Sequence, residues 1–219
     1  MKYTVQSGDS FFQIAQRHGL TLEELQAANP QVENPSVLFP GQILIIPGQR
    51  RDNHHQKYYV DEPYPEIQVM GKNQAYANLL LEDYAGRVSE TTAIMQYVFH
   101  HMHMARIPGW EEVAEMEEKI SIVEMHHLEI LGKLILLLGG NPRYWDSHQQ
   151  FWNASFVNYQ DFDPCAQLRA DIQGEKTAIL NYRTRIQQIQ DPYIQAILER
   201  IIKDEEHHLM LFNQALSRF

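Results

Sequence analysis

Carboxylate and imidazole side chains recur in the same order in two parts of this 219-residue chain. Each part supplies a lone glutamate and, further along, a Glu-x-x-His pair. The six residues are Glu90, Glu124, His127, Glu175, Glu205 and His208. Glutamates and histidines in this order form a ligand set by which a four-helix bundle holds two metal ions. The pattern therefore predicts a dinuclear metal site and the bundle that positions it.

Helical geometry and charge explain how such a set would bind metal. Residues three apart lie on one face of a helix, so each Glu-x-x-His pair can bind one ion. We expect Glu90 and Glu175 to lie mid-helix among apolar neighbours, where an unpaired carboxylate would be costly. Two divalent cations would balance four carboxylates beside two neutral imidazoles. Mixed oxygen and nitrogen donors suit iron or manganese, so we predict two Fe or Mn ions.

Several polar residues near these ligands have their own predicted roles. Tyr97 and Tyr182 each follow a predicted ligand glutamate by seven residues, and either hydrogen-bond a ligand or pack in the core. Asp204 could accept a proton from a ligand imidazole on a neighbouring helix. His126 and His207 point about 100° away from the adjacent motif histidines, which places them at the rim or surface.

Apolar periodicity and helix-ending residues predict four helices after residue 72. Their ranges are about 73–104, 111–138, 164–190 and 192–217. Short connections make the first two and the last two helices antiparallel hairpins, and a long aromatic-rich crossover over 141–163 joins the hairpins. At the end of the first helix, we interpret three histidines as a polar helix end rather than as ligands. These are His100, His101 and His103.

The composition limits the classes to which this protein can belong. Hydrophobic residues make up 44% of the chain, and a formal charge of −10 argues against nonspecific binding to nucleic acid or anionic membranes. No apolar run approaches the roughly 20 residues that a membrane-spanning helix needs. The single cysteine, Cys165, rules out an internal disulfide and a Cys₄ metal site. The first residues show no secretory-signal pattern, so we expect synthesis in a cytoplasm.

Residues 1–48 form a separate predicted unit with the order strand, helix, helix, strand. Its characteristic positions are Tyr3, Val5, Gly8, Asp9, Ser10, Ile14, Ala15, Gly19, Leu25, Asn29, Pro30, Leu38, Pro40, Gly41, Gln42, Leu44, Ile46 and Pro47. With these residues the unit resembles a LysM module. Such modules bind chains of N-acetylglucosamine, so the resemblance implies peptidoglycan or another polymer of this sugar as a partner.

By position, the resemblance assigns the sugar-binding groove to two loops. Their residues are Gly8, Asp9, Ser10, Phe11 and Phe12, then Asn29, Pro30, Gln31 and Val32. For Gly8, Asp9 and Asn29, turn and cap chemistry is an equally good explanation. Residues 49–72 are charged and polar and contain two prolines, so we interpret them as a linker. The pair His54 and His55 could bind metal, but a histidine pair in a flexible linker usually has no role.

The third segment, residues 73–219, is similar to the ferritin-like superfamily, which includes bacterioferritin, rubrerythrin and manganese catalase. The stretches 122–131 and 202–209 are closest to rubrerythrin-like and manganese-catalase-like proteins. The predicted fold class is therefore mainly α, a ferritin-like four-helix bundle with a small N-terminal βααβ LysM domain. The resemblance implies a carboxylate-bridged centre that reacts with peroxide or oxygen. One cysteine cannot build the Cys₄ iron domain of rubrerythrin, and manganese catalases usually have a less symmetric ligand set.

Two functions from different classes fit these patterns. The first is a peptidoglycan-associated enzyme that removes peroxide at a di-manganese or di-iron centre, with ferroxidase activity as the next choice. The second is a structural or adaptor protein of the cell wall or spore coat, in which the metals only stabilise the bundle. We favour the enzyme and expect a homodimer. A wall-binding module without an export signal would fit a spore-coat layer, which is built inside a mother cell.

Overall fold

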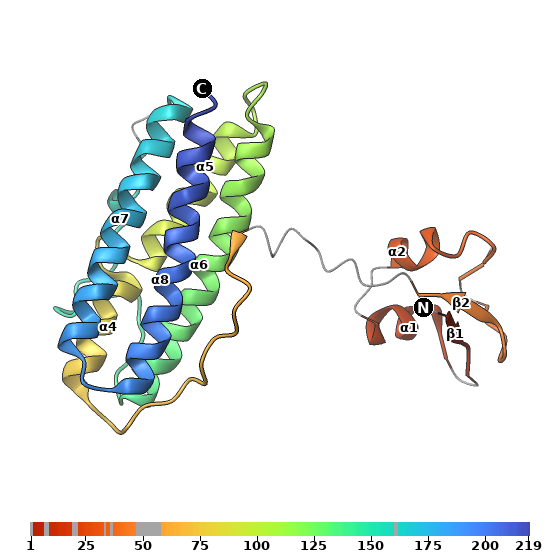
Figure 1. The fold of residues 1–219 in the computed structure, drawn as a ribbon, viewed down its shortest axis with the longest axis horizontal. Coiled ribbons are helices and arrows are strands. Elements are labelled where there is room, and N and C mark those ends of the chain that lie inside the picture. Colours follow the sequence, from red (N-terminus) through yellow and green to blue (C-terminus); the bar gives the residue numbers. More distant parts are fainter. Residues whose placement is uncertain are drawn as a thin grey trace. The chain divides into compact units, whose positions relative to one another are not determined.

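The protein consists of two compact units, Met1–Asn53 and His54–Phe219, in the computed structural model (Figure 1). The structure describes residues 2–6, 9–18, 22–32, 34–35, 37–46, 58–159 and 162–219. Gly8, the histidine pair His54 and His55, and the predicted boundary at residue 48 lie outside the described residues.

The N-terminal unit has the predicted order of elements. Strand β1 (Lys2–Thr4) pairs antiparallel with β2 (Ile43–Ile45). Between them in the chain come α1 (Phe11–Arg17) and α2 (Leu22–Ala27). The buried apolar side chains are Val5, Phe11, Ile14, Ala15, Leu25, Val32, Leu44 and Ile46. Removing these side chains from water gives the short unit a hydrophobic core of its own.

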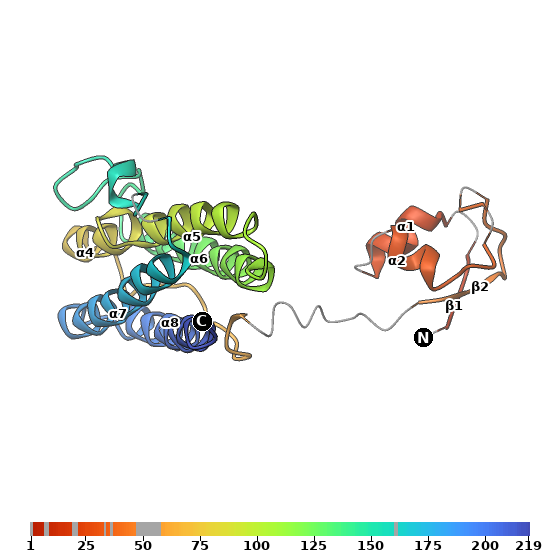
Figure 2. The same ribbon diagram turned by 90° about the horizontal axis from the view of Figure 1, so that it is seen from above.

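The C-terminal unit is a helical bundle with one long crossover. Its elements are α4 (Gln74–Ala85), α5 (Glu90–Met104), α6 (Glu111–Leu137), the 3-10 turn η1 (Ala154–Phe156), α7 (Pro164–Gln188) and α8 (Pro192–Leu216). Helix α5 packs against α6, and α7 packs against α8, as Figures 1 and 2 show. The mainly helical fold class is confirmed. None of the helices that the structure describes is long and apolar enough to cross a bilayer.

Local sequence sets the ends of the long helices. Asp163 and Asp191 cap α7 and α8 by accepting hydrogen bonds from backbone N–H groups of the first turn. Proline follows each of these caps at the first helical position, where no N–H is needed. Gly139, with φ at +86°, follows the end of α6 in the left-handed conformation that glycine adopts most easily.

The first predicted helix is broken into two, which corrects the expectation of one continuous helix. A Cβ on Gly86 would lie 2.4 Å from the carbonyl oxygen of Glu82, so the chain can turn here only with a glycine. Ser89 then caps α5 by accepting a hydrogen bond from the N–H of Thr92. Glu90 consequently lies in the first turn of α5, and its predicted mid-helix position is wrong.

Residues 58–72, which we call the strap, belong to the bundle rather than to a linker. Tyr58 is buried in the apolar core. Arg200 of α8 donates hydrogen bonds to the carbonyl oxygens of Val60 (2.6 Å) and Glu62 (2.8 Å). The linker interpretation fails for these residues because their backbone groups find partners in the bundle, which composition alone does not reveal.

Two apolar clusters enclose a polar layer in the bundle. Along α6, Ile120 belongs to one cluster and Ile130 to the other. Along the antiparallel α8 the order is reversed, with Ile201 in the second cluster and Phe212 in the first. The buried ionisable residues between these positions are Glu124, His127, Asp204, Glu205 and His208. The hydrophobic core therefore surrounds the predicted metal site at both ends.

Candidate metal centre and glycan-binding residues

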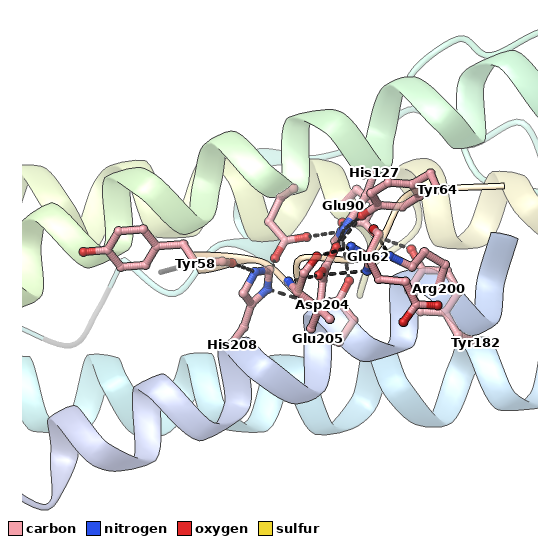
Figure 3. Close-up of polar contacts among 12 residues, drawn as sticks. Tyr58, Glu62, Tyr64, Glu90, His127, Tyr182, Arg200, Asp204, Glu205 and His208 are labelled. Carbon is pink, nitrogen blue, oxygen red and sulfur yellow. Dashed lines mark hydrogen bonds and ion pairs between the residues drawn. The ribbon is translucent and has the colours of Figure 1, made fainter. Parts of the chain in front are cut away.

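The six residues of the repeated pattern meet inside the bundle. Helix α5 supplies Glu90, α6 supplies Glu124 and His127, α7 supplies Glu175, and α8 supplies Glu205 and His208. Each of the six is at most 4% exposed. Their ligand atoms form two groups of four residues, and the atoms of each group lie within 4.8 Å of one another. Figure 3 shows Glu90, His127, Glu205 and His208 extending into the same region between the helices.

Glu124 and Glu205, the shared glutamates, belong to both groups and lie between the two imidazoles. Glu124 Oε2 is 2.9 Å from His127 Nδ1, and its Oε1 is 2.8 Å from His208 Nδ1. Glu205 Oε1 is 3.1 Å from His127 Nδ1, and its Oε2 is 3.6 Å from His208 Nδ1. Each shared glutamate thus directs one oxygen to each half of the centre, which is the arrangement of a carboxylate that bridges two ions.

The residues of this centre fit two metal ions, because the protein alone leaves several of their buried atoms unsatisfied. Among the described residues, Glu124 Oε1, Glu205 Oε1 and His208 Nδ1 make no well-aligned hydrogen bond, although Glu124 Oε1 and His208 Nδ1 lie only 2.8 Å apart. A buried polar atom without a partner is destabilising. Two divalent cations would satisfy these atoms, and carboxylate with imidazole donors suits iron or manganese.

The strap fixes which nitrogen each imidazole presents to the centre. His208 Nε2 lies 2.9 Å from the carbonyl oxygen of Tyr58. A carbonyl can only accept, so Nε2 carries a proton and Nδ1 is the nitrogen that faces the shared glutamates. His127 Nε2 lies 2.9 Å from the Tyr64 hydroxyl, which itself donates to Asp204. Nε2 therefore donates to the strap in both histidines, and such support is typical of metal-binding imidazoles.

Asp204 anchors the strap beside His127 (Figure 3). Its Oδ1 accepts a hydrogen bond from Val60 N–H at 2.7 Å and lies 2.9 Å from an Arg200 nitrogen. Its Oδ2 lies 3.3 Å from His127 Nε2, on the neighbouring helix as expected from the sequence. Burial alone would raise the pKa of Asp204, but hydrogen bonds from His127 and Tyr64 hold it well below its usual range.

Two tyrosines hold the lone glutamates, Glu90 and Glu175, in crossed pairs. Tyr97 of α5 donates from its hydroxyl to Glu175 Oε1 of α7 at 2.5 Å. Tyr182 of α7 donates to Glu90 Oε1 of α5. Of the two sequence interpretations, hydrogen bonding to a glutamate and burial in the core are both realised, because each ring is buried while its hydroxyl reaches the centre.

Burial and repulsion set the protonation of the metal-free centre. Burial raises the pKa of Glu90 and Glu175 well above the usual range, and repulsion from the shared glutamates adds to it. Burial disfavours charge on the imidazoles, but nearby acidic groups outweigh it and raise the pKa of His127, and that of His208 to about 10. The metal-free centre therefore pairs two imidazolium ions with the shared carboxylates and keeps the lone glutamates neutral.

A pocket of about 210 Å³ leads to the centre between α5 and α7. The lone and the shared glutamates all form part of its wall. The break between α4 and α5 adds Arg87 and Ser89 to the lining, and the Arg87 guanidinium lies 5.4 Å from the ring of Phe156. The strap contacts α6 and α8 instead. The centre is thus open to small molecules on the carboxylate side and covered on the imidazole side.

The histidines outside the ligand set differ from one another in burial. His126 is exposed and His207 is half-buried, in line with their predicted place at the rim. His100, in contrast, is 0% exposed, so its assignment to a polar helix end is wrong. It contacts Asp171 on α7, a pairing between distant segments that no local pattern reveals.

Three residues assigned to the sugar groove turn their side chains into the core of the N-terminal unit, namely Phe11, Asn29 and Val32. Asn29 Nδ2 donates to the carbonyl oxygens of Leu25 (2.8 Å) and Ile45 (2.7 Å). These side chains hold the fold together, so a sugar cannot contact them without disrupting it. For Phe11, Asn29 and Val32, packing in the core of the unit therefore explains the side chain better than the predicted contact with a sugar.

Other members of the predicted groove are accessible. Ser10, Pro30 and Gln31 are exposed, and Phe12 is 60% exposed although it is a large apolar side chain. Asp9 is partly buried and accepts a hydrogen bond from a tyrosine hydroxyl at 2.6 Å. Phe12 is therefore the most accessible large apolar side chain among the described residues of the predicted groove.

Comparison with known protein families defines the class of both units. Residues 88–219 match the ferritin-like domain, and residues 3–47 match the LysM domain. The ferritin-like match covers more than half of the chain. The chain therefore belongs to the ferritin-like family and carries an N-terminal LysM domain, which confirms both resemblances.

Individual relatives of the bundle include catalases and bacterioferritins. A "probable manganese catalase" of Clostridium acetobutylicum is 27% identical over 170 residues, which cover 70% of this chain and 75% of that protein. A bacterioferritin of Streptomyces coelicolor is 32% identical over 124 residues, covering 55% and 69%. The crystal structure of a manganese catalase from Anabaena aligns with a TM-score of 0.65 at 27% identity, covering 74% and 80%. Relatives matched through the LysM domain alone are spanned for a fifth of their length or less.

Replacing Tyr64 by phenylalanine tests the role of the strap. Tyr64→Phe removes the hydroxyl that receives the His127 Nε2 proton, so we expect metal affinity to fall about 10- to 100-fold while the helical circular dichroism is unchanged. Equilibrium dialysis against Mn²⁺ measures the effect. The exposed Tyr193→Phe is the matched control. Equal affinities of the two variants would show that the strap does not support the imidazole.

Metal binding should release protons. The imidazoles and the lone glutamates hold protons in the metal-free protein, so loading two divalent ions at neutral pH should release up to four per chain. Apparent affinity should therefore rise with pH, because the raised pKa of His208, about 10, keeps that proton in competition throughout the neutral range. Calorimetry in buffers of different ionisation enthalpy counts the protons. Binding without proton release would refute this protonation scheme.

Proposed function

We propose that this protein removes hydrogen peroxide at a dinuclear manganese or iron centre. The observation that carries the proposal is the buried set of four carboxylates and two imidazoles, arranged as two groups that share Glu124 and Glu205. Similarity to manganese catalases over most of the bundle supports manganese and peroxide. Similarity to a bacterioferritin and the equal ligand set of the two halves support iron with ferroxidase activity as the second candidate.

The reaction converts two molecules of peroxide into two of water and one of oxygen, so it needs no external reductant. Two ions bound at this centre would exchange electrons with peroxide. The protein's own residues position the reactants. Tyr97 and Tyr182 hold the lone glutamates beside the pocket through their hydroxyl groups. The strap covers the imidazole side, so a small molecule reaches the centre from the pocket.

Asp83 is the residue best suited to hold a proton during turnover. It lines the pocket, its Oδ2 accepts a hydrogen bond from Arg185 Nε at 2.8 Å, and its Oδ1 has no partner among the described residues. Burial raises its pKa to about 7. A carboxyl group that titrates near neutrality can accept a proton from peroxide and return it to the departing water.

The pocket favours an enzyme over a scaffold whose metals only stabilise the bundle. A purely structural centre gains nothing from a cavity that reaches its carboxylates, since closed coordination is typical of structural metal sites. Here all four glutamates contribute to the pocket wall.

The LysM domain supports attachment to a wall polysaccharide. We propose that it binds N-acetylglucosamine chains of peptidoglycan and places the bundle at the cell wall or in a spore coat. The exposed ring of Phe12 is the strongest candidate contact, because an aromatic face can stack on the apolar face of a sugar. We further propose that the bundle forms a homodimer.

Oxygen evolution from peroxide tests the catalytic proposal. Protein loaded with Mn²⁺ should release one O₂ per two H₂O₂, and Glu124→Ala/Glu205→Ala should release none. Asp83→Asn should keep its metal but lose activity about 100-fold or more, together with the rise in rate near pH 7. Glu118→Gln, at a side chain that is 47% exposed, is the control for a charge change on the bundle. A fully loaded protein without turnover, for either metal, would leave the scaffold as the better account.

Pull-down with purified peptidoglycan tests the attachment. Phe12→Ala should reduce the bound fraction of the full-length chain several-fold, because the sugar loses its aromatic contact. Phe151→Ala, in the bundle, removes a ring of similar exposure, 67% against 60%, and should bind like the unchanged protein. Equal binding by both variants would place the sugar site elsewhere.

A further inference from the structure

A second cluster of ligand-type side chains lies in the same bundle, apart from the dinuclear centre. It consists of His100 on α5, Glu117 on α6 and Asp171 on α7, whose ligand atoms lie within 4.8 Å of one another. All three residues are 0% exposed. Glu117 precedes Glu124 by about two helical turns, and Asp171 precedes Glu175 by about one. The cluster therefore occupies the same interior but lies further toward one end of the bundle.

His100 contacts Asp171 on one side of its ring and the crossover on the other. His100 Nδ1 is 2.9 Å from Asp171 Oδ2, and Nε2 is 3.4 Å from the carbonyl oxygen of Asn158. Nδ1 can donate to this carboxylate, and when it carries no proton its lone pair and the Asp171 oxygen can bind a cation together.

Glu117 shows that this cluster holds more negative charge than the side chains around it satisfy. Neither of its carboxylate oxygens has a hydrogen-bond partner among the described residues. Asp171, by contrast, also receives a hydrogen bond from Gln96 Nε2 at 2.8 Å. A fully buried carboxylate without donors is destabilised unless a proton or a cation neutralises it. Consistent with this, burial and the nearby Asp171 raise the pKa of Glu117 well above its usual range.

We propose that His100, Glu117 and Asp171 bind a third divalent metal ion, separate from the dinuclear centre. Two carboxylates balance the charge of one divalent ion, and one nitrogen with carboxylate oxygens suits Mn²⁺, Fe²⁺ or Zn²⁺. The site is braced from outside, since Gln96 accepts a hydrogen bond from the N–H of Asn158 at 3.1 Å. The ion would thus tie α5, α6 and α7 together beside the crossover. The competing account is a proton shared by Glu117 and Asp171.

Metal counting with Mn²⁺ as the only added ion separates the two accounts. The full chain, loaded anaerobically and dialysed, should hold three Mn per chain and show an isolated six-line electron paramagnetic resonance signal beside the coupled signal of the pair. Glu117→Gln should hold two and lose the six-line signal. Glu118→Gln, at the next residue of α6, whose side chain is 47% exposed, should hold three. Two Mn and no isolated signal in the unchanged chain would overturn the proposal in favour of the shared proton.

A second variant makes this result independent of the dinuclear centre. Glu124→Ala/Glu205→Ala should retain one Mn per chain with the six-line signal, and adding Glu117→Gln to it should remove that ion. Asp171→Asn offers the same test if Glu117→Gln does not fold. The third site can thus be detected even in a chain whose dinuclear centre binds no metal. Loss of all Mn in Glu124→Ala/Glu205→Ala would count against the third site.

Discussion

Four carboxylates buried between helices impose the constraint on which the bundle depends. Charges of one sign cannot be taken out of water together without compensation. In the metal-free protein, protons on the lone glutamates and on both imidazoles provide it, so that two cations face two anions. Two divalent ions in place of four protons leave the formal charge of the cluster unchanged. The centre can therefore load metal without a net change in buried charge.

The surrounding structure supports this exchange by fixing the orientation of each ligand. The tyrosines cross between α5 and α7 to hold the lone glutamates, so the two halves of the bundle position each other's ligands. The strap holds both imidazoles through Nε2 and leaves Nδ1 for the metal. This support is not symmetric, because Asp204 lies before the motif of α8 while Val123 takes that place in α6. The histidine of one half is therefore supported by a carboxylate, Asp204 beside His127, and that of the other half by the Tyr58 carbonyl beside His208.

The sequence allowed prediction of the ligand set because the chemistry is local. A Glu-x-x-His pair spans a single helical turn and can be recognised in the sequence directly. Because the pair occurs twice, metal binding was a better explanation than two residues on a solvent-exposed helix face. The two hairpins and the crossover followed from Gly, Pro and Asp at helix ends. The helix break at Gly86 was missed because the apolar periodicity continues through it, whereas the close approach to Glu82 is a feature of the folded backbone.

Contacts between distant segments could not be predicted either, because they too are features of the folded chain and leave no local pattern. The strap has the composition of a linker, yet it is bound by Arg200, about 140 residues later in the chain. The sequence predicted that His100 belongs to a polar helix end, whereas in the fold Asp171 of α7 lies beside it. In the N-terminal unit, Asn29 matched a sugar-binding position, but its amide is used up by backbone groups of β2. Burial separates such residues from accessible ones, and a single sequence does not show burial.

Anomalous X-ray diffraction from crystals of the Mn²⁺-loaded protein tests the central claim most directly. The account predicts two strong manganese peaks about 3.5 to 4 Å apart, with Glu124 and Glu205 each contacting both and one histidine Nδ1 on each. A single peak among these six residues, or none at saturating Mn²⁺, would contradict a centre built on shared carboxylates.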